Sequence, residues 1–243
     1  MSKIIHGNCI SVMKDIGDKS IDMILCDPPY GKTAEVWDTI IPFHLLWIEY
    51  KRIIKDNGAI VLFSIQPFTS KLIMSNIYWY RHEWIWVKNT QTGMMLAGKA
   101  PMKKHENIIV FSRKRTMFNG QKLLGSEISQ HHSKRGYTYK NKRSSLYNVE
   151  GGVEFSWSEF IHPNTILLCN VVGNRDKTKK HPTQKPVPLL EYFIKTYTNP
   201  GDLVLDNCAG SGSTGEACKN TDRDYILIEQ DLDYFNIIQQ RLI

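Results

Sequence analysis

The sequence lacks an apolar run long enough to cross a membrane, a Cys-x-x-Cys pair and any internal repeat. A transmembrane helix needs about 20 consecutive apolar residues, so none is expected. The five cysteines are scattered and odd in number, and their spacing predicts neither a disulfide framework nor a zinc site. The first residues also lack the charged and then apolar layout of a signal peptide. We therefore expect a cytoplasmic protein with free thiols and no bound metal.

The length of 243 residues and the hydrophobic share of 42% suffice for one substantial core, so a single domain with an elaboration is expected. Short apolar runs alternate with stretches of helical periodicity. The predicted strands are Ile21–Cys26, Ala59–Phe63, His82–Val87, Asn107–Phe111, Leu203–Leu205 and Tyr225–Ile228. The predicted helices are Phe43–Ile54, which Asn57 and Gly58 should end, Leu190–Tyr197, Ser213–Lys219 and Asp231–Leu242. This alternation predicts an α/β fold with a doubly wound, mostly parallel sheet.

The triphosphate-binding signature G-x-x-x-x-G-K-[ST] is absent as well, whereas residues 210–215 have the glycine spacing G-x-G-x-x-G. They lie in and directly after a glycine-rich turn, Asp206–Thr214, which follows the predicted strand Leu203–Leu205 and precedes a helix. Its glycines allow the backbone to approach a ligand closely, because no Cβ stands in the way. The next strand is followed by Glu229, whose carboxylate suits ribose hydroxyls. Together these features predict an adenosine-containing cofactor.

The tetrad Asp27-Pro28-Pro29-Tyr30 follows the predicted strand Ile21–Cys26. An exocyclic amino nitrogen of a base is a poor nucleophile, because its lone pair is delocalised into the ring. Asp27 and the carbonyl of Pro28 could accept its two hydrogens, the prolines would hold that carbonyl rigid, and Tyr30 could stack on the base. The nitrogen could then attack a sulfonium methyl in line. In a simpler alternative, the prolines only end the strand and Asp27 caps a turn.

A strongly basic segment lies between these two motifs. The chain has a formal net charge of +7, and the stretch from Arg113 to Arg143 contains nine basic residues and one acid, Glu127. Histidines and tyrosines are interleaved with them, so cations could meet phosphates while aromatic groups reach bases. A solvated, mobile loop is the alternative interpretation. The candidates for contact with nucleic acid are Arg113, Lys114, Arg115, Lys134, Arg135, Lys140, Lys142 and Arg143.

Several motifs, in this order along the chain, resemble the amino-methyltransferase superfamily of DNA methyltransferases in its β-class arrangement. They are the tetrad at Asp27, the turn Asp206-x-x-x-Gly210-Ser-Gly212, His181-Pro-Thr-Gln-Lys-Pro186, His105-Glu-Asn-Ile-Ile-Val-Phe111 and Gly7-Asn-Cys9. The likeness covers almost the whole chain, and residues 112–162 alone lack a recognisable motif. It implies a Rossmann-like methyltransferase fold with a catalytic half at 1–111, a target-recognition insertion at 112–162 and a cofactor-binding half at 163–243.

The resemblance also implies S-adenosylmethionine as the cofactor, double-stranded DNA as the substrate and adenine N6 as the methylated atom. Asp27, Pro28, Pro29 and Tyr30 would form the catalytic pocket, into which the target base is flipped. The implied cofactor-binding residues are Asn8, Cys9, Asp27, Gln184, Lys185, Asp206, Cys208, Ala209, Gly210, Ser211, Gly212, Ser213, Thr214 and Glu229. No metal is required, and a homodimer would extend the short reach of such a chain on DNA, as in many members of this class.

The chain departs from the family pattern in the cofactor turn. That turn usually reads Asp-Pro-Phe-x-Gly-Ser-Gly, whereas this chain has Asn207 and Cys208 at its second and third positions, and Asn8 stands where the class often has Asp. Adenine is favoured over cytosine because enzymes that methylate cytosine N4 more often carry Ser where Asp27 stands. Cytosine N4 methylation and a non-catalytic, nucleic-acid-binding partner subunit are the alternatives.

Overall fold

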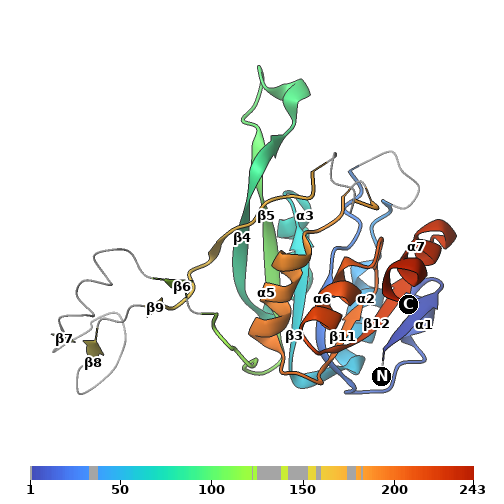
Figure 1. Ribbon diagram of the computed structural model, residues 1–243, viewed down its shortest axis with the longest axis horizontal. Coiled ribbons are helices and arrows are strands. Elements are labelled where there is room, and N and C mark those ends of the chain that lie inside the picture. The colour runs from blue at the N-terminus through green and yellow to red at the C-terminus, as the bar shows by residue number, and fades with distance from the viewer. Residues whose placement is uncertain are drawn as a thin grey trace. The chain divides into compact units, whose positions relative to one another are not determined.

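A mixed sheet of eight strands organises the larger of the two units into which the chain divides (Figure 1). The computed structural model describes residues 2–32, 38–121, 123–124, 138–141, 153–156, 160–173, 179–181 and 183–243. The larger unit comprises residues 1–119 and 165–243, and the smaller unit comprises residues 120–164. Among the described residues, no helix combines the length and the apolar character that a bilayer crossing requires.

The strands of the larger unit lie in the order β1 (Lys3–His6), β12 (Asp224–Glu229), β11 (Leu203–Asp206), β2 (Ile21–Cys26), β3 (Ile54–Ser64), β5 (Lys103–Phe111), β4 (Tyr80–Thr92) and β10 (Ile166–Leu168). Neighbours among the first five run parallel. Strand β5 is antiparallel to both β3 and β4, and β10 is parallel to β4. The predicted α/β fold with a mostly parallel sheet is therefore confirmed.

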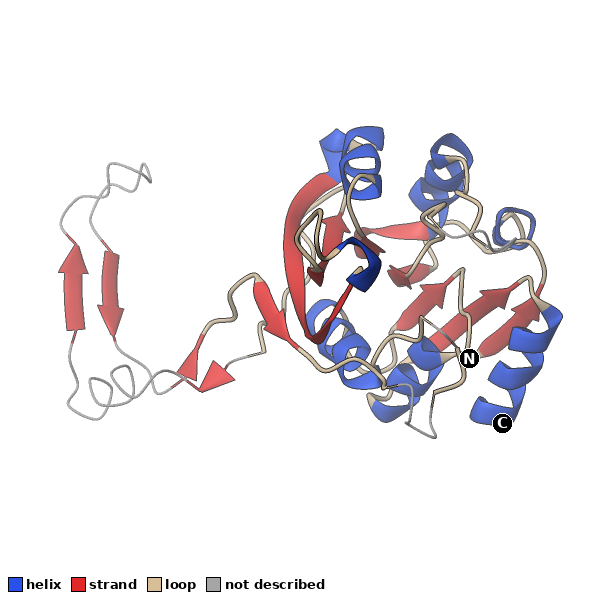
Figure 2. Ribbon diagram, turned by 90° about the horizontal axis from the view of Figure 1, so that it is seen from above, coloured by secondary structure: helices blue, strands red, loops and turns tan. Residues whose placement is uncertain are grey.

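Helices cover both faces of this sheet (Figure 2). One face carries α1 (Cys9–Met13), α2 (Phe43–Ile53) and α3 (Phe68–Ser75), and the other carries α5 (Val187–Tyr197), α6 (Ser213–Asn220) and α7 (Leu232–Leu242). Successive side chains of a strand point to opposite faces, and in β2 both faces are apolar. Met23 and Leu25 belong to the core under α5. Ile24 and Cys26 belong to the core under α2, so β2 is buried from both sides.

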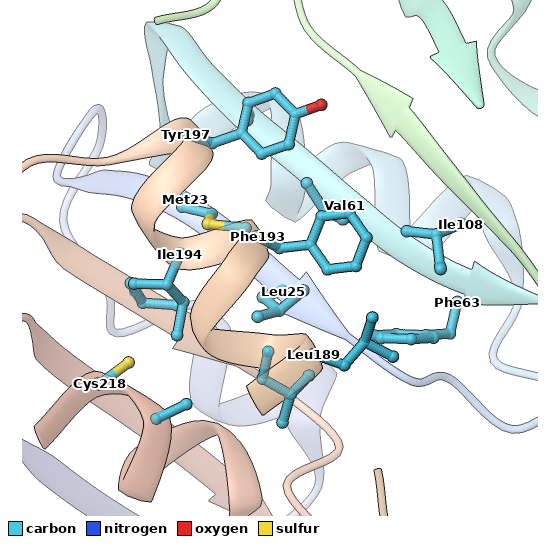
Figure 3. Packing of buried hydrophobic residues seen from close by; sticks show 14 of the residues in the cluster. Met23, Leu25, Val61, Phe63, Ile108, Leu189, Phe193, Ile194, Tyr197 and Cys218 are labelled. Carbon is cyan, nitrogen blue, oxygen red and sulfur yellow. The ribbon is translucent and has the colours of Figure 1, made fainter. Parts of the chain in front are cut away.

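Phe193 lies within the core beneath α5 (Figure 3). Its fully buried ring makes edge-to-face contacts with Phe63 and Trp84, at 6.2 Å and 5.9 Å between ring centroids. Figure 3 shows α5 directing Leu189, Phe193 and Ile194 toward strands β2 and β3. The apolar stripe predicted at helical spacing is thus the buried face of α5.

The sequence-based end of the first long helix was wrong. The helix predicted to reach Ile54 ends one residue earlier, and Asn57 and Gly58 lie inside β3, where its pairing with β2 shifts register. A Cβ at Gly58 would lie 2.8 Å from the carbonyl oxygen of Asp22. Glycine is needed here because the two strands approach closely, not because a helix ends.

The smaller unit contains two antiparallel strand pairs among its described residues. Strand β6 (Leu123–Leu124) pairs with β9 (Phe160–Ile161), and β7 (Thr138–Asn141) pairs with β8 (Val153–Ser156). This unit overlaps the segment 112–162, whose role in target recognition stays a prediction.

We predict that Phe193→Ala lowers the free energy of unfolding by about 3–5 kcal/mol, because it removes a buried ring and leaves a cavity. Urea denaturation measures this loss. The control is Leu232→Ala, at a position that is 56% exposed, which should change the same quantity by less than about 0.5 kcal/mol. Equal effects of the two variants would contradict the central packing role of Phe193.

Candidate active site

One edge of the sheet collects the predicted site residues. Strands β2, β11, β12 and β1 are neighbours in a parallel array, so their carboxyl ends lie together. Asp27, Asp206 and Glu229 stand at these ends, where ligands of such sheets bind. A pocket of about 700 Å³ opens there, a volume within the range of small-molecule sites. All predicted catalytic and cofactor-binding residues except Gly212 line this pocket.

The carboxylate of Asp27 lies between two donors. The Tyr30 hydroxyl donates to one of its oxygens, and the Lys185 ammonium donates to the other. The Asp27 side chain is 25% exposed, and it lines the pocket. Burial raises the pKa of Asp27 above its usual range, and the charge of Lys185 opposes that rise. The protonation of the tetrad therefore depends on one buried cation.

Two acids share the ammonium of Lys185. Its nitrogen contacts Asp27 and lies 3.5 Å from Oε2 of Glu106. Burial by itself would lower the pKa of Lys185, but the two carboxylates outweigh burial and raise it. The other oxygen of Glu106 accepts from the Lys88 ammonium, and the two cations keep the pKa of Glu106 low despite its burial. Lys185, which the resemblance places among the cofactor-binding residues, is thus held by two protein carboxylates.

Asp38 holds the loop that follows the tetrad. One oxygen of its carboxylate accepts from the backbone N–H groups of Tyr30 and Gly31, at 2.8 Å and 2.9 Å. The other oxygen accepts from the N–H of Lys32 at 2.7 Å. Asp38 is buried, so these charge-assisted hydrogen bonds are strong. They fix the backbone that carries the Tyr30 side chain.

Asp206 organises the glycine-rich turn. One of its oxygens accepts from the N–H of Cys208 at 3.1 Å, and the other accepts from the Thr214 hydroxyl at 2.6 Å. Burial raises the pKa of Asp206 to about 7. Gly210 has a φ of +51°, in the left-handed region that favours glycine. The carboxylate thus shapes the turn from inside while lining the pocket.

Glu229 fastens the same turn from the end of β12. Its two oxygens accept from the N–H groups of Gly210 at 2.7 Å and of Asp231 at 2.9 Å. A carboxylate has further lone pairs, which can accept from a ligand in the pocket. Asn8 likewise has both a structural contact and a place at the pocket. Its side chain caps the amino end of α1, and the residue lines the pocket.

Asn207 and Cys208, the two departures from the family turn, both have specific partners. The amide oxygen of Asn207 accepts from the buried Tyr50 hydroxyl at 2.5 Å. The Cys208 thiol interacts with the thiols of Cys9 and Cys26. Hydrogen bonding to Cys208 lowers the pKa of Cys9 to about 7, although burial opposes the shift. A cluster of three thiols therefore lines the pocket at the turn where the family usually carries Phe.

The motif before α5 also contributes to the pocket. The Ser211 hydroxyl donates to Oε1 of Gln184 at 3.3 Å, which joins this motif to the glycine-rich turn. The His181 ring packs against Tyr234 at 4.3 Å between ring centroids, and both line the pocket. Burial lowers the pKa of His181 to about 4, so this histidine is neutral at pH 7.

Sequence reasoning missed several of these residues. Asp38, Lys88, Glu106, His181 and Tyr234 line the pocket but carried no predicted role. One signal was present for Glu106, since it is an acid placed directly before the apolar run of β5. Its neighbour His105, the first residue of the same motif, is exposed. His181 also belongs to a motif noted in the sequence, whereas Asp38, Lys88 and Tyr234 are brought to the pocket only by the fold.

The predicted DNA-binding residues are partly described. Arg113 and Lys114 pair with Asp56, at 3.2 Å and 3.0 Å, near the amino end of β3, whereas the pocket lies at the carboxyl end. The structure therefore gives them an intramolecular partner instead of a place beside the pocket. Arg115 is exposed, and Lys140 belongs to β7. Lys134, Arg135, Lys142 and Arg143 lie outside the described residues.

Similarity to known proteins identifies the family. The family model described as DNA methylase, of the N6/N4 type, matches residues 21–240. The chain belongs to this family. Among curated relatives, the type II methyltransferase M.HpaI of Haemophilus parainfluenzae is 30% identical over 254 residues, which cover 99% of this chain and 74% of the relative. M.HinfI of Haemophilus influenzae is 29% identical, covering 100% of this chain and 68% of the relative.

Solved structures share the fold. M1.HpyAVI in complex with S-adenosylmethionine matches with a TM-score of 0.64 and 25% identity, covering 100% of both chains. The cytosine-N4-specific PvuII DNA methyltransferase matches with a TM-score of 0.67 and 14% identity, over 99% of this chain and 86% of that one, which shows the fold alone. The protein is thus a DNA methyltransferase that uses S-adenosylmethionine, and the predicted family and cofactor are confirmed.

We predict that Asp38→Ala lowers the rate of methyl transfer to DNA by about 10- to 100-fold, because a reacting group displaced by about 1 Å loses much of its positioning. The affinity for S-adenosylmethionine should stay close to that of the wild type. Single-turnover transfer of labelled methyl and calorimetric titration measure the two quantities. The control is Asp18→Ala, whose side chain is 71% exposed on the surface. A larger loss of cofactor affinity than of rate would contradict this role of Asp38.

Proposed function

We propose that this methyltransferase methylates N6 of adenine in a short recognition sequence of double-stranded DNA, by flipping the base and attacking in line. The observation that carries the proposal is the position of Asp27, which follows β2 directly and lines the pocket beside the rigid carbonyl of Pro28. A carboxylate at this position, where cytosine N4 enzymes more often carry serine, favours adenine.

The pocket suits S-adenosylmethionine in size and charge. Among the carboxylates that line it, those of Asp27, Asp206 and Glu229 complement a ligand with an ammonium, a sulfonium and ribose hydroxyls. S-adenosylmethionine supplies a methyl group that the sulfonium charge activates toward nucleophiles. We assign Asp206, Gly210, Ser211 and Gly212 to the methionine part. Glu229 is assigned to the ribose, Asn8 and Cys9 to the adenine and Gln184 to the carboxylate.

The target amino group is assigned to the part of the pocket at Asp27. A carboxylate oxygen of Asp27 and the carbonyl of Pro28 accept its two hydrogens, which localises the lone pair on the nitrogen. The Tyr30 hydroxyl already occupies one oxygen of Asp27, so the incoming amino group replaces this hydrogen bond with its own. The Tyr30 ring packs against Phe68 at 5.2 Å and offers its other face for stacking. Because burial raises the pKa of Asp27, its carboxylate can take the proton that the methylated nitrogen releases.

The DNA side of the proposal rests on the basic segment. Residues 112–162 are assigned to target recognition, with exposed Arg115 and strand β7, which carries Lys140, among the described candidates for phosphate contact. A homodimer would extend this surface along the duplex. Cytosine N4 is the alternative target, because the same pocket chemistry serves either exocyclic amino group.

Sequencing with detection of modified bases, applied to DNA from cells that express the protein, tests the proposal. N6-methyladenine is expected at the copies of one short motif. N4-methylcytosine in its place would overturn the adenine assignment. Unmodified DNA from cells that contain folded protein would favour the non-catalytic partner subunit.

We predict that Asp27→Asn lowers the rate of methyl transfer by at least about 10²-fold, because an amide takes no proton and stabilises the developing charge poorly. Single-turnover assays with labelled S-adenosylmethionine and duplex DNA measure this rate. Tyr30→Phe is the control, since it keeps the stacking face and removes only the hydroxyl, and its loss should stay within about 10-fold. Wild-type rates for Asp27→Asn would remove this residue from the mechanism.

We predict that Glu229→Gln weakens S-adenosylmethionine binding by about 10- to 100-fold, because hydrogen bonds to a charged acceptor contribute about 1.5–3 kcal/mol. The rate at saturating cofactor should change little, since Glu229 is assigned to the ribose and not to the reacting methyl. Calorimetry and the dependence of rate on cofactor concentration separate these effects. A loss confined to the saturated rate would contradict the assignment.

A further inference from the structure

Lys88 and Glu106 line the pocket without a role in cofactor or base binding as assigned above. We propose that Glu106, held by Lys88, is a positioning residue for methyl transfer, which competes with Asp27 for the Lys185 ammonium and so determines how firmly that ammonium holds the Asp27 carboxylate. The inference rests on the proposed function of Asp27 and concerns two residues that do not touch the reacting atoms.

Lys88 anchors Glu106 from the neighbouring strand. The register of β4 and β5 pairs Trp86 with Glu106, and Lys88, two residues further, lies on the same side of the sheet. The Lys88 ammonium donates to Oε1 of Glu106 and lies 4.9 Å from the centre of the Trp86 ring. The side chains of Lys88 and Glu106 are 14% and 11% exposed. One oxygen of Glu106 is therefore tied to a fixed, largely buried cation.

The second oxygen of Glu106 is left to Lys185. This Oε2 atom is buried and accepts no hydrogen bond within the described part of the chain. The Lys185 nitrogen lies 3.5 Å from it, beyond the usual length of a hydrogen bond, while it donates to Asp27 at hydrogen-bond distance. The Phe63 ring, 5.0 Å from the same nitrogen, contacts the ammonium as well. Lys185 thus lies between two acids and nearer to Asp27.

A purely structural role accounts poorly for this cluster. Removing four charges from water is costly, and apolar side chains of similar size often stabilise a fold equally well or better. Two acids and two cations instead alternate from β4 to the tetrad, with no net charge. In such a chain the place of each ammonium depends on the neighbouring acids, so a change at Lys88 reaches Asp27 through Glu106 and Lys185.

The pKa of Asp27 depends on the charged groups around it, so the pH dependence of the rate reports a change in their positions. The titratable groups around it are Tyr30 and Cys26 of its own segment, Lys185 before α5, Glu106 on β5 and Asp206 at the end of β11. Glu106 and Asp206 disfavour the ionised form of Asp27, whereas Lys185 favours it. Because burial raises the pKa of Asp27, the acidic limb of the rate profile is expected above the ordinary range of an aspartate. A displacement of Lys185 moves that limb.

The test is the pH profile of the single-turnover rate, at saturating S-adenosylmethionine and duplex DNA. Glu106→Gln removes a competitor for Lys185 and a repulsive charge, so the acidic limb should move to lower pH by about one unit. Lys88→Met leaves Glu106 without its own cation, so Glu106 draws Lys185 away from Asp27 and the limb should move to higher pH by about one unit. Because Lys88 acts on Asp27 through Glu106, the double variant should show the same limb as Glu106→Gln alone.

Two lysine variants serve as controls. Lys88→Arg keeps the charge beside Glu106 and should leave the limb where the wild type has it. Lys55→Met breaks another lysine–acid pair between strands, with Asp22, near the amino end of β3 and away from the pocket, and should also leave it in place. Thermal melting and cofactor titration establish that each variant is folded. If one of the two single variants, Glu106→Gln or Lys88→Met, does not fold, the direction in which the acidic limb moves in the other still tests the proposal.

An acidic limb that stays in place, or that moves the same way in Glu106→Gln and Lys88→Met, would overturn the proposal. Loss of rate without a shift would assign the two residues a structural role only. Failure of the proposed function has a different signature, because Asp27→Asn would then keep the wild-type rate. If the methyl group is found on cytosine N4, the same profiles are measured on that product.

Discussion

The buried contact between the Lys185 ammonium and the Asp27 carboxylate is the interaction around which the site is built. An ionised carboxylate largely removed from water costs several kcal/mol unless a charged partner offsets the loss. Lys185 in turn depends on Glu106 and on the Phe63 ring to be stable at this depth. The segments that carry these groups are distant in sequence and must all be in place. The charge state of the tetrad is therefore a property of the whole fold.

Core packing and catalysis are linked through α5. This helix begins directly after Pro186, and its buried face, with Phe193 at its centre, fixes the helix against β2 and β3. The residue that precedes Pro186 is Lys185, so the packing of α5 also places the ammonium. On the other side of the pocket, Asp206 and Glu229 hold the glycine-rich turn through its backbone. Asp206 and Glu229 are the last residues of strands, and Asp27 and Lys185 lie within two residues of a strand or helix end, so rigid elements place the charged groups.

The sequence predicted best where a single physical cause acted. Strand β2 was predicted to the residue, because a strand buried on both faces is a continuous apolar run with Asp27 and two prolines after it. Strands β1 and β10 and helix α3 were not predicted. The first two are short edge strands with exposed side chains, and nothing in such a pattern separates them from a loop. The Asn57-Gly58 pair led to a wrong helix end in the prediction. Glycine is favoured both where a helix ends and where two strands approach closely, so the residue type alone does not separate the two cases.

What the sequence determined by itself was the family, the cofactor and the identity of the tetrad, because these reside in contiguous motifs whose residue types carry the chemistry. It also determined the mostly parallel sheet, since strands alternating with helices leave few other arrangements. The tertiary structure decided the partners of Asp27. Lys185 follows it by more than 150 residues, and Glu106, Lys88 and Asp38 come from three further segments. Electrostatic pairing acts through space, and a sequence contains no distance between residues that only folding brings together.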